Sequence, residues 1–399
     1  MDKLSVAKQT VAKLLAVAVL VVGLGARVNA APEGPPVEIP VIVQLTGPAA
    51  LLGQIQVPAL QLLEKQVNNT GGIHGRPLHF TFSDDQSNPV VALQLASQVI
   101  NAHTANVVLG GGLAATCRAS IPLFATNGPV LYCLSPAATP PKGSYVFTSS
   151  IAARDSYTTS IRFFHHMGWN KIAVINSTDA SGAEVDAITD AILAEPENRD
   201  IQVVAHEHFA PTDVSIAAQA SKIKASGAQA IVMWGVSPAL ATAFRSFKDV
   251  GLDIPVSASP IMQLYTALAQ YATILPSHLY FASTPWASYP NVRRGPFRDV
   301  LDTYFSAFKT IAVVPDAGQT TAWDPGLIVV DALRHLPPDP SATQIRDYIE
   351  SMHGFYGVNG RYDFRSGDQR GLTAANIEMV EWRPADKGWA LAWAQSGTL

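Results

Sequence analysis

The chain has 399 residues, of which 48% are hydrophobic and 15% charged, and its formal net charge at pH 7 is −4. This length exceeds what one compact core normally holds and is sufficient for two domains. High hydrophobicity with few charges excludes an intrinsically disordered chain.

The first 30 residues are typical of a cleavable export signal. Lysines precede a short apolar stretch at residues 14–25, and residues 28–30 read Val-Asn-Ala. The apolar stretch is shorter than the roughly 20 residues that a transmembrane helix needs. We therefore expect a mature protein that begins at Ala31 and resides in the periplasm. Without residues 1–30, the chain has 23 basic and 30 acidic residues, a net charge of −7 that argues against nucleic acid as a partner.

From residue 37 onward, short apolar strands alternate with helical stretches. We expect strands at residues 38–45, 77–85, 105–112, 129–136, 170–177, 201–209, 228–235 and 252–259. Helices are expected at residues 59–69, 88–103, 322–336 and 341–354, followed by strand-like segments at 360–366 and 374–384. Near-continuous apolar strands separated by helices are typical of parallel sheets covered on both faces. The predicted fold class is α/β with two Rossmann-like lobes, divided near residues 145–155.

Three consecutive glycines end the strand expected at residues 105–112. Gly110, Gly112 and Ala115 formally match the G-x-G-x-x-A fingerprint of dinucleotide sites. The next strand ends without the acid that would hold a ribose, and no Lys-Ser/Thr pair follows the glycines. We therefore expect no nucleotide cofactor. Free backbone amides at the start of the following helix are instead suited to a carboxylate.

A long stretch of the chain contains no carboxylate. Asp85 and Asp155 bound this stretch, and Arg118, Lys142 and Arg154 lie within it. One interpretation is that buried strands and helices exclude charge. The other is that this region surrounds a bound anion.

Cys117 and Cys133 are the two cysteines of the chain. In an oxidising compartment such a pair predicts a disulfide, worth about 3 kcal/mol for a short loop. The alternatives are two buried thiols and a catalytic Cys117 at the start of a helix. We find no G-x-S-x-G, H-E-x-x-H or C-x-x-C motif that would indicate an enzyme or a zinc site.

The histidines show no metal-binding spacing. His165 and His166 are adjacent, so on a helix their side chains point in different directions. We interpret the scattered histidines as ordinary polar residues and expect no metal site: His74, His79, His103, His206 and His208.

Aromatic residues at strand ends are candidates for the walls of a cleft. These are Tyr132, Trp234, Phe281 and Trp286. The alternative for each of them is ordinary core packing.

Four segments carry a resemblance to a known family. They are residues 45–54 (LTGPAALLGQ), 71–92 (GGIHGRPLHFTFSDDQSNPVVA), 134–141 (LSPAATPP) and 246–256 (SFKDVGLDIPV). The sequence resembles the leucine/isoleucine/valine-binding type of periplasmic substrate-binding protein, which has the type I fold and serves ABC importers. The resemblance implies a monomer without cofactors or enzymatic activity. Such a protein would close on a small molecule and present this ligand to an ABC permease in the inner membrane.

The resemblance also implies two lobes joined by three crossovers, which we place near Ser149, Ser283 and Gly357. After the signal at residues 1–30, lobe 1 then comprises residues 31–148 and 284–357. Lobe 2 comprises residues 149–283 and 358–399.

Binding residues of the first lobe follow from the family pattern. Leu113 and Ala114 occupy the positions of the family's paired serines, so the serine hydroxyls are missing. The backbone amides of these two residues and of Ala115 and Thr116 could still donate to a carboxylate. Leu52 stands where the family often has an aromatic residue.

The Ser-Pro-Ala-Ala-Thr loop of the family is intact. It runs from Ser135 to Thr139, with the carbonyl of Ala137 and the hydroxyl of Thr139 available to a ligand.

The second lobe departs further from the pattern. Ser181 and Ser237 replace two family tyrosines, and Pro260 aligns with the glutamate that pairs with the ligand ammonium. An ammonium without a partner in a dry cleft would cost several kcal/mol.

We therefore expect a carboxylate ligand on an apolar or aromatic body, lined by Leu52, Leu113, Tyr132 and Met262. A branched-chain or other apolar amino acid is the alternative ligand, and a ligand sensor is the second alternative function.

Overall fold

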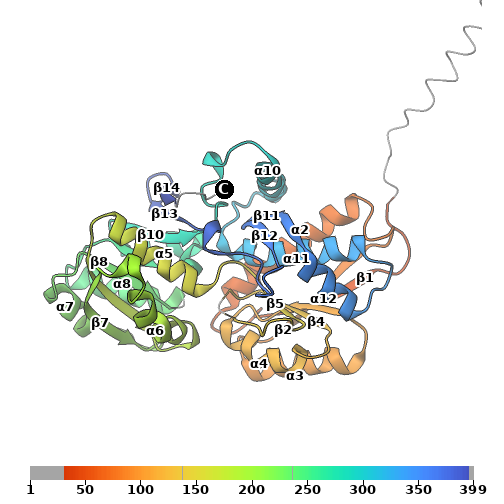
Figure 1. Ribbon diagram of the computed structural model, residues 1–399, viewed down its shortest axis with the longest axis horizontal. Coiled ribbons are helices and arrows are strands. Elements are labelled where there is room, and N and C mark those ends of the chain that lie inside the picture. Colours follow the sequence, from red (N-terminus) through yellow and green to blue (C-terminus); the bar gives the residue numbers. More distant parts are fainter. Residues whose placement is uncertain (1–30, 137, 236, 395–399) are drawn as a thin grey trace, which may run out of the picture.

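The computed structural model describes residues 31–136, 138–235 and 237–394, with the backbone alone at residues 237 and 238. The chain forms two lobes, each built on its own sheet and flanked by helices (Figure 1). Within the described ranges, no helix is both long and apolar enough to cross a membrane. The predicted signal segment, residues 1–30, lies outside the described residues.

The sheet of the first lobe is entirely parallel, with strand order β2-β1-β3-β4-β5. Its strands are β1 (Val37–Val43), β2 (Leu78–Asp84), β3 (Val107–Gly110), β4 (Val130–Cys133) and β5 (Val146–Thr148). The helices of this lobe are α2 (Ala50–Asn69), α3 (Pro89–Ala102), α4 (Ala114–Phe124), α10 (Pro296–Lys309), α11 (Ala317–His335) and α12 (Ala342–Ser351). Helices α2 and α11 pack together, as do α3 and α4.

The sheet of the second lobe has the order β14-β13-β10-β9-β8-β6-β7. Its parallel strands are β6 (Lys171–Ser177), β7 (Gln202–Phe209), β8 (Ala230–Trp234), β9 (Val256–Ala258) and β10 (Leu279–Ser283). Two antiparallel strands follow, β13 (Glu378–Arg383) and β14 (Gly388–Ala394). The parallel strands of both sheets confirm the predicted α/β class.

The helices of the second lobe are α5 (Ala153–His166), α6 (Ala180–Leu193), α7 (Ala217–Ala225), α8 (Ser237–Asp249) and α9 (Tyr265–Gln270). The described residues also form short 3-10 helices: η1 (Pro196–Asn198), η2 (Pro260–Met262), η3 (Tyr289–Asn291) and η4 (Ala374–Asn376).

Local sequence explains where several helices begin. The side chain of Asn88 accepts a hydrogen bond from the amide of Val90, and Pro89 follows it at the first helical position of α3. Asparagine as a cap and proline at this position both favour a helix start. Ser341 and Gln344 form the reciprocal capping box at the start of α12.

A two-stranded hairpin, β11 (His353–Gly357) and β12 (Gly360–Asp363), stays with the first lobe. The amide of Thr148 donates to the carbonyl oxygen of Gln369 at 3.0 Å, so the chain beyond the hairpin still lies against β5. The position that we predicted for the third crossover between the lobes, near Gly357, coincides with the turn of this hairpin. The chain reaches the second sheet at β13.

Asp324 on α11 holds this hairpin in place. Its buried carboxylate accepts hydrogen bonds from the amides of Val358 (2.8 Å) and Asn359 (2.9 Å) and from the Tyr362 hydroxyl (2.8 Å). Burial raises the pKa of Asp324 despite these hydrogen bonds.

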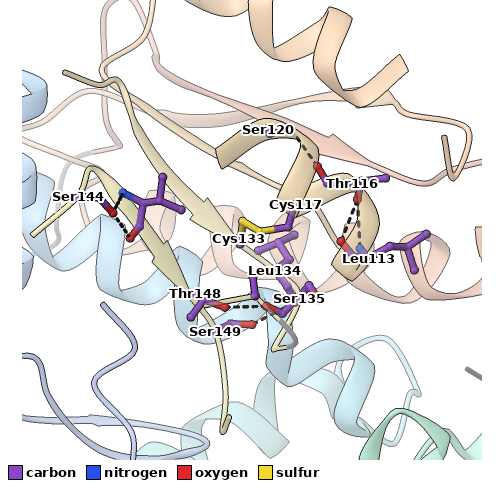
Figure 2. The surroundings of a disulfide bond; sticks show 12 residues. Leu113, Thr116, Cys117, Ser120, Cys133, Leu134, Ser135, Ser144, Thr148 and Ser149 are labelled. Atoms are coloured by element: carbon purple, nitrogen blue, oxygen red, sulfur yellow. Dashed lines mark hydrogen bonds between the residues drawn. A yellow bond between two sulfur atoms is a disulfide. The ribbon is translucent and has the colours of Figure 1, made fainter. Parts of the chain in front are cut away.

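Cys117 and Cys133 form a disulfide that joins α4 to the end of β4 (Figure 2). Both residues are completely buried, in the core between α3, α4 and the first sheet. The predicted disulfide is confirmed, and the alternative of a free catalytic Cys117 is excluded because its sulfur is bonded.

Candidate functional site

A cavity of about 220 Å³ lies between the two lobes. Its walls follow β3 and β4 of the first sheet and β6, β8, β9 and β10 of the second, at the ends where the chain leaves each strand. The crevice outside the carboxyl ends of parallel strands is where open α/β sheets bind ligands. The cavity therefore lies where the topology places a binding site.

Six of the residues predicted from the sequence line this cavity. They are Leu52, Leu113, Ala114, Ala115, Ser135 and Ser181. Leu52 comes from α2, Ser135 follows β4, and Ser181 begins α6 from the opposite lobe. Residues far apart in the sequence thus meet at one place.

Other predicted residues do not line the cavity. Met262 is completely buried, and Thr139 is exposed outside the lining. Thr116 is buried in the first turn of α4 and does not line the cavity either. Ala137 and the side chain of Ser237 lie outside the described part of the chain.

The N-cap side chain of α4 caps none of the amides in its first turn; the side-chain contact to an amide described there is that of the Thr116 hydroxyl, which accepts from the amide of Leu113 at 3.3 Å (Figure 2). Leu113 stands at the N-cap position. Its aliphatic side chain has no oxygen that could accept from the amides of Ala114, Ala115 and Thr116. These amides have no partner within the helix, and the helix dipole places partial positive charge there. Because Ala114 and Ala115 line the cavity, this helix start is suited to a carboxylate.

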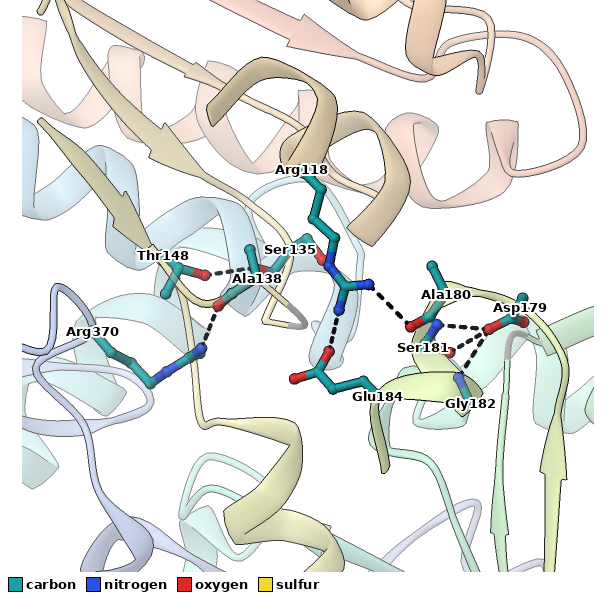
Figure 3. A network of polar contacts seen from close by, with 10 residues as sticks. All are labelled: Arg118, Ser135, Ala138, Thr148, Asp179, Ala180, Ser181, Gly182, Glu184 and Arg370. Carbon is teal, nitrogen blue, oxygen red and sulfur yellow. Dashed lines mark hydrogen bonds and ion pairs between the residues drawn. The ribbon is translucent and has the colours of Figure 1, made fainter. Parts of the chain in front are cut away.

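The loop that contains Ser135 is fixed from behind. The hydroxyl of Thr148 donates to the carbonyl oxygen of Ser135 at 2.7 Å (Figure 3). Arg370, which is buried, donates to the carbonyl oxygens of Ala138 at 2.7 Å and of Ser149 at 3.2 Å. Burial lowers the pKa of Arg370, and nearby acids oppose this shift. Arg370 thus ties the loop to the crossover between the lobes.

Asp179 is the only charged side chain among the described residues that line the cavity. Its Oδ1 caps α6 and accepts from the amides of Ser181 (2.8 Å) and Gly182 (3.0 Å) (Figure 3). Its Oδ2 is buried without a hydrogen-bond partner in the described structure. A buried carboxylate oxygen without a partner is costly, so a cationic donor from a ligand would stabilise it.

Gln263 adds an unpartnered donor to the same cavity. Its side chain is buried, and its Nε2 has no hydrogen-bond partner in the described residues. Close by, the carboxylate of Asp316 caps α11 and accepts from the amides of Tyr265 (2.9 Å) and Gly318 (3.0 Å). Burial raises the pKa of Asp316 to about 7.

Two of the four aromatic candidates line the cavity. Trp234 and Trp286 contribute to its wall. Tyr132 and Phe281 are completely buried in the core and do not line it, so core packing is the correct interpretation for these two.

The cations of the carboxylate-free stretch do not line the cavity. Arg118 forms an ion pair with Glu184 at 2.6 Å, Arg154 forms one with Glu195 at 2.7 Å, and Lys142 is exposed. The partners of both arginines therefore come from the second lobe. Residues 112–115 and 134–136 of the same stretch do line the cavity, so the interpretation that this region surrounds a bound anion stays a prediction.

Sequence reasoning missed Asp179, Gln263 and Arg370. Asp179 could have been found, because an aspartate shortly after the strand expected at residues 170–177 is a typical cap for a helix that follows. The role of Arg370 could not, since its partners lie more than 200 residues away in the sequence.

A family model described as periplasmic binding protein matches residues 36–388 of the chain. A leucine-, isoleucine-, valine-, threonine- and alanine-binding protein of Pseudomonas aeruginosa is 25% identical over 215 residues, which cover 52% of this chain and 56% of that protein. A Leu/Ile/Val-binding protein homologue of Brucella melitensis is 25% identical over 226 residues, covering 54% and 59%. The chain thus spans between half and two thirds of the length of these relatives.

Solved structures share the fold. An extracellular ligand-binding receptor of Rhodopseudomonas palustris has a TM-score of 0.78 at 20% identity, covering 90% of this chain and all of that one. The branched-chain amino acid transporter substrate binding protein LivJ of Streptococcus pneumoniae, solved with isoleucine, has a TM-score of 0.73 at 16% identity, covering 89% and 98%.

Proposed function

Because the chain belongs to the periplasmic binding protein family, we propose that it binds a small carboxylate solute between its lobes and delivers it to an ABC permease of the inner membrane. It does so in the periplasm, as a monomer and without catalysis. The observation that carries this proposal is the uncapped start of α4 at the cavity. Ala114 and Ala115 there present backbone amides to the carboxylate.

An apolar amino acid is the ligand class that we favour. Its carboxylate would bind at α4, and its ammonium would donate to the free Oδ2 of Asp179. Leu52, Leu264 and Trp286 would surround the apolar side chain. The relatives named for binding leucine, isoleucine and valine support this class.

An apolar or aromatic organic acid is the second candidate. Pro260 lines the cavity at the position where the resembled family has a glutamate, and no side chain but Asp179 among the described lining residues carries charge. Such an acid would need no ammonium partner. Its body would lie against the same apolar wall.

A calorimetric titration with leucine, valine and benzoate tests the proposal. We expect one of these carboxylates to bind and Ala114→Asp to abolish that binding, because the added charge repels a carboxylate in a desolvated cleft. Thr126→Asp adds the same charge at an exposed position beyond the end of α4 and serves as the control. Unchanged binding by Ala114→Asp would refute the carboxylate position.

A further inference from the structure

Three side chains with metal-binding atoms converge on the second lobe, away from the residues that line the cavity. Asp186 lies on α6, and His206 and His208 lie on β7. The Nε2 atom of His206 is 2.8 Å from Oδ1 of Asp186, and the Nε2 atom of His208 is 2.6 Å from Oδ2. One ligand atom from each of the three residues falls within 4.8 Å of the others.

The strand positions explain why the two imidazoles face the same carboxylate. Residues two apart on a strand point to the same face of a sheet, so His206 and His208 both project toward α6. Glu207 between them bonds Lys222 instead. The two rings lie side by side, with centroids 5.0 Å apart.

A buried neighbour orients the carboxylate. The side-chain amide of Asn176, on the adjacent strand β6, donates to Oδ1 of Asp186 at 3.0 Å. Asn176 is completely buried and pairs with His208 in the strand register. Hydrogen bonds of this kind from outside the ligand set fix the orientation of metal ligands.

The donor set determines the class of ion. Two neutral imidazoles and one carboxylate suit Zn²⁺, Cu²⁺, Ni²⁺ and Co²⁺, whereas Mg²⁺ and Ca²⁺ prefer oxygen alone. Zinc bonds of about 2.1 Å in a tetrahedral site separate ligand atoms by roughly 3.4 Å. The two Asp186–histidine contacts, at 2.8 and 2.6 Å, would each have to lengthen by less than about 1 Å to admit the ion. All three side chains are partly exposed, at 29% to 45%, so an ion can enter and keep a water molecule as its fourth ligand.

We propose that Asp186, His206 and His208 bind one divalent transition-metal ion of the zinc class. The ion would replace the hydrogen bonds between the carboxylate and the imidazoles and would tie α6 to the edge strand β7. This site is independent of the proposed ligand. It would nevertheless stiffen the helix whose start, at Ala180 and Ser181, lines the cavity.

Calorimetric titration of untagged, chelator-treated protein with zinc chloride tests this site. We expect one zinc ion per chain for the wild type and an affinity lower by about tenfold or more for His206→Gln and His208→Gln. His278→Gln is the matched control, because His278 contacts a single carboxylate, Glu381, at 2.8 Å in the same lobe. It should bind zinc like the wild type.

Cobalt(II) provides a second measurement that does not depend on how the variants fold. Wild-type protein with one equivalent of Co²⁺ should show visible absorption typical of four- or five-coordinate cobalt with nitrogen ligands. Equal zinc affinity in all variants would overturn the proposal. So would a cobalt spectrum identical to that of the hydrated ion.

Discussion

The guanidinium of Arg118 on α4 lies 2.6 Å from the carboxylate of Glu184 on α6, and so links the two lobes (Figure 3). The same guanidinium also donates to the carbonyl oxygen of Ala180 at 3.3 Å. Ala180 lines the cavity. The two lobes are therefore held together at the edge of the candidate ligand site.

Removing this link should favour the open arrangement of the lobes. Arg118→Met keeps most of the aliphatic stem and removes the charge. Partly exposed ion pairs contribute about 0.2–1 kcal/mol, so we expect the closed population to fall by up to about fivefold. Small-angle X-ray scattering of the ligand-free protein should give a larger radius of gyration for the variant.

The control for this experiment is Arg154→Met. Arg154 pairs with Glu195 at 2.7 Å, but both residues belong to the second lobe. Its radius of gyration should match that of the wild type. An unchanged radius for Arg118→Met would show that the pair does not hold the lobes together.

Asp179→Asn separates the two ligand classes. Asparagine keeps an oxygen that can cap α6 but removes the charge. If the ligand is an amino acid, its ammonium loses a charged hydrogen bond, and we expect leucine affinity to fall by about tenfold or more. Calorimetry measures this change, with Asp190→Asn at an exposed position of the same helix as the control. Binding of leucine that is insensitive to Asp179→Asn would contradict our ammonium position.

Replacing both cysteines with alanine should destabilise the protein. The disulfide closes a loop with a sequence separation of 16 residues, and the chain-entropy model assigns such a loop about 3 kcal/mol. Urea unfolding of the Cys117→Ala, Cys133→Ala double variant measures the loss. Thiol titration of denatured wild type should detect no free thiol, and a full equivalent of reactive thiol would contradict the bond.

Burial of Glu378 should make stability depend on pH. Burial raises its pKa from 4.5 to about 7 in the folded protein. The folded state therefore keeps a proton that the unfolded state loses between about pH 4.5 and 7, so stability falls as the pH rises through this range. The contribution is on the order of 3 kcal/mol.

Glu378→Gln removes this titration. We expect the free energy of unfolding of the variant to fall less between pH 5 and pH 8 than that of the wild type. Glu38→Gln, at an exposed position, should retain the wild-type dependence. Parallel pH profiles for wild type and Glu378→Gln would contradict the assignment.

Much of the fold was predictable because buried parallel strands are nearly continuous apolar runs. Residues 230–234 form β8 and are all buried, as their sequence Ala-Ile-Val-Met-Trp indicates. The end of the chain was harder to predict. The hairpin of β11 and β12 depends on the buried carboxylate of Asp324, a long-range contact that no local pattern reveals.

The candidate site was predictable where backbone position decides it. Leu113 and Ala114 line the cavity because they follow β3, whatever their side chains are. The position of Asp179 as a helix cap was predictable, but the unpartnered Oδ2 of Asp179 and Nε2 of Gln263 were not, since only the fold determines which atoms lack a hydrogen-bond partner. The cluster of His206, His208 and Asp186 likewise arises because α6 brings Asp186 within contact of two side chains of β7, rather than from a recognisable motif.

Mass spectrometry of the small molecules released on denaturing the natively purified protein tests the central proposal most directly. We predict one carboxylic acid with an apolar or aromatic body, present at close to one molecule per chain. An amine on that acid would identify the ammonium that Asp179 is proposed to bind. A sugar, a polyamine or a phosphate ester at that stoichiometry would contradict a carboxylate site at the start of α4.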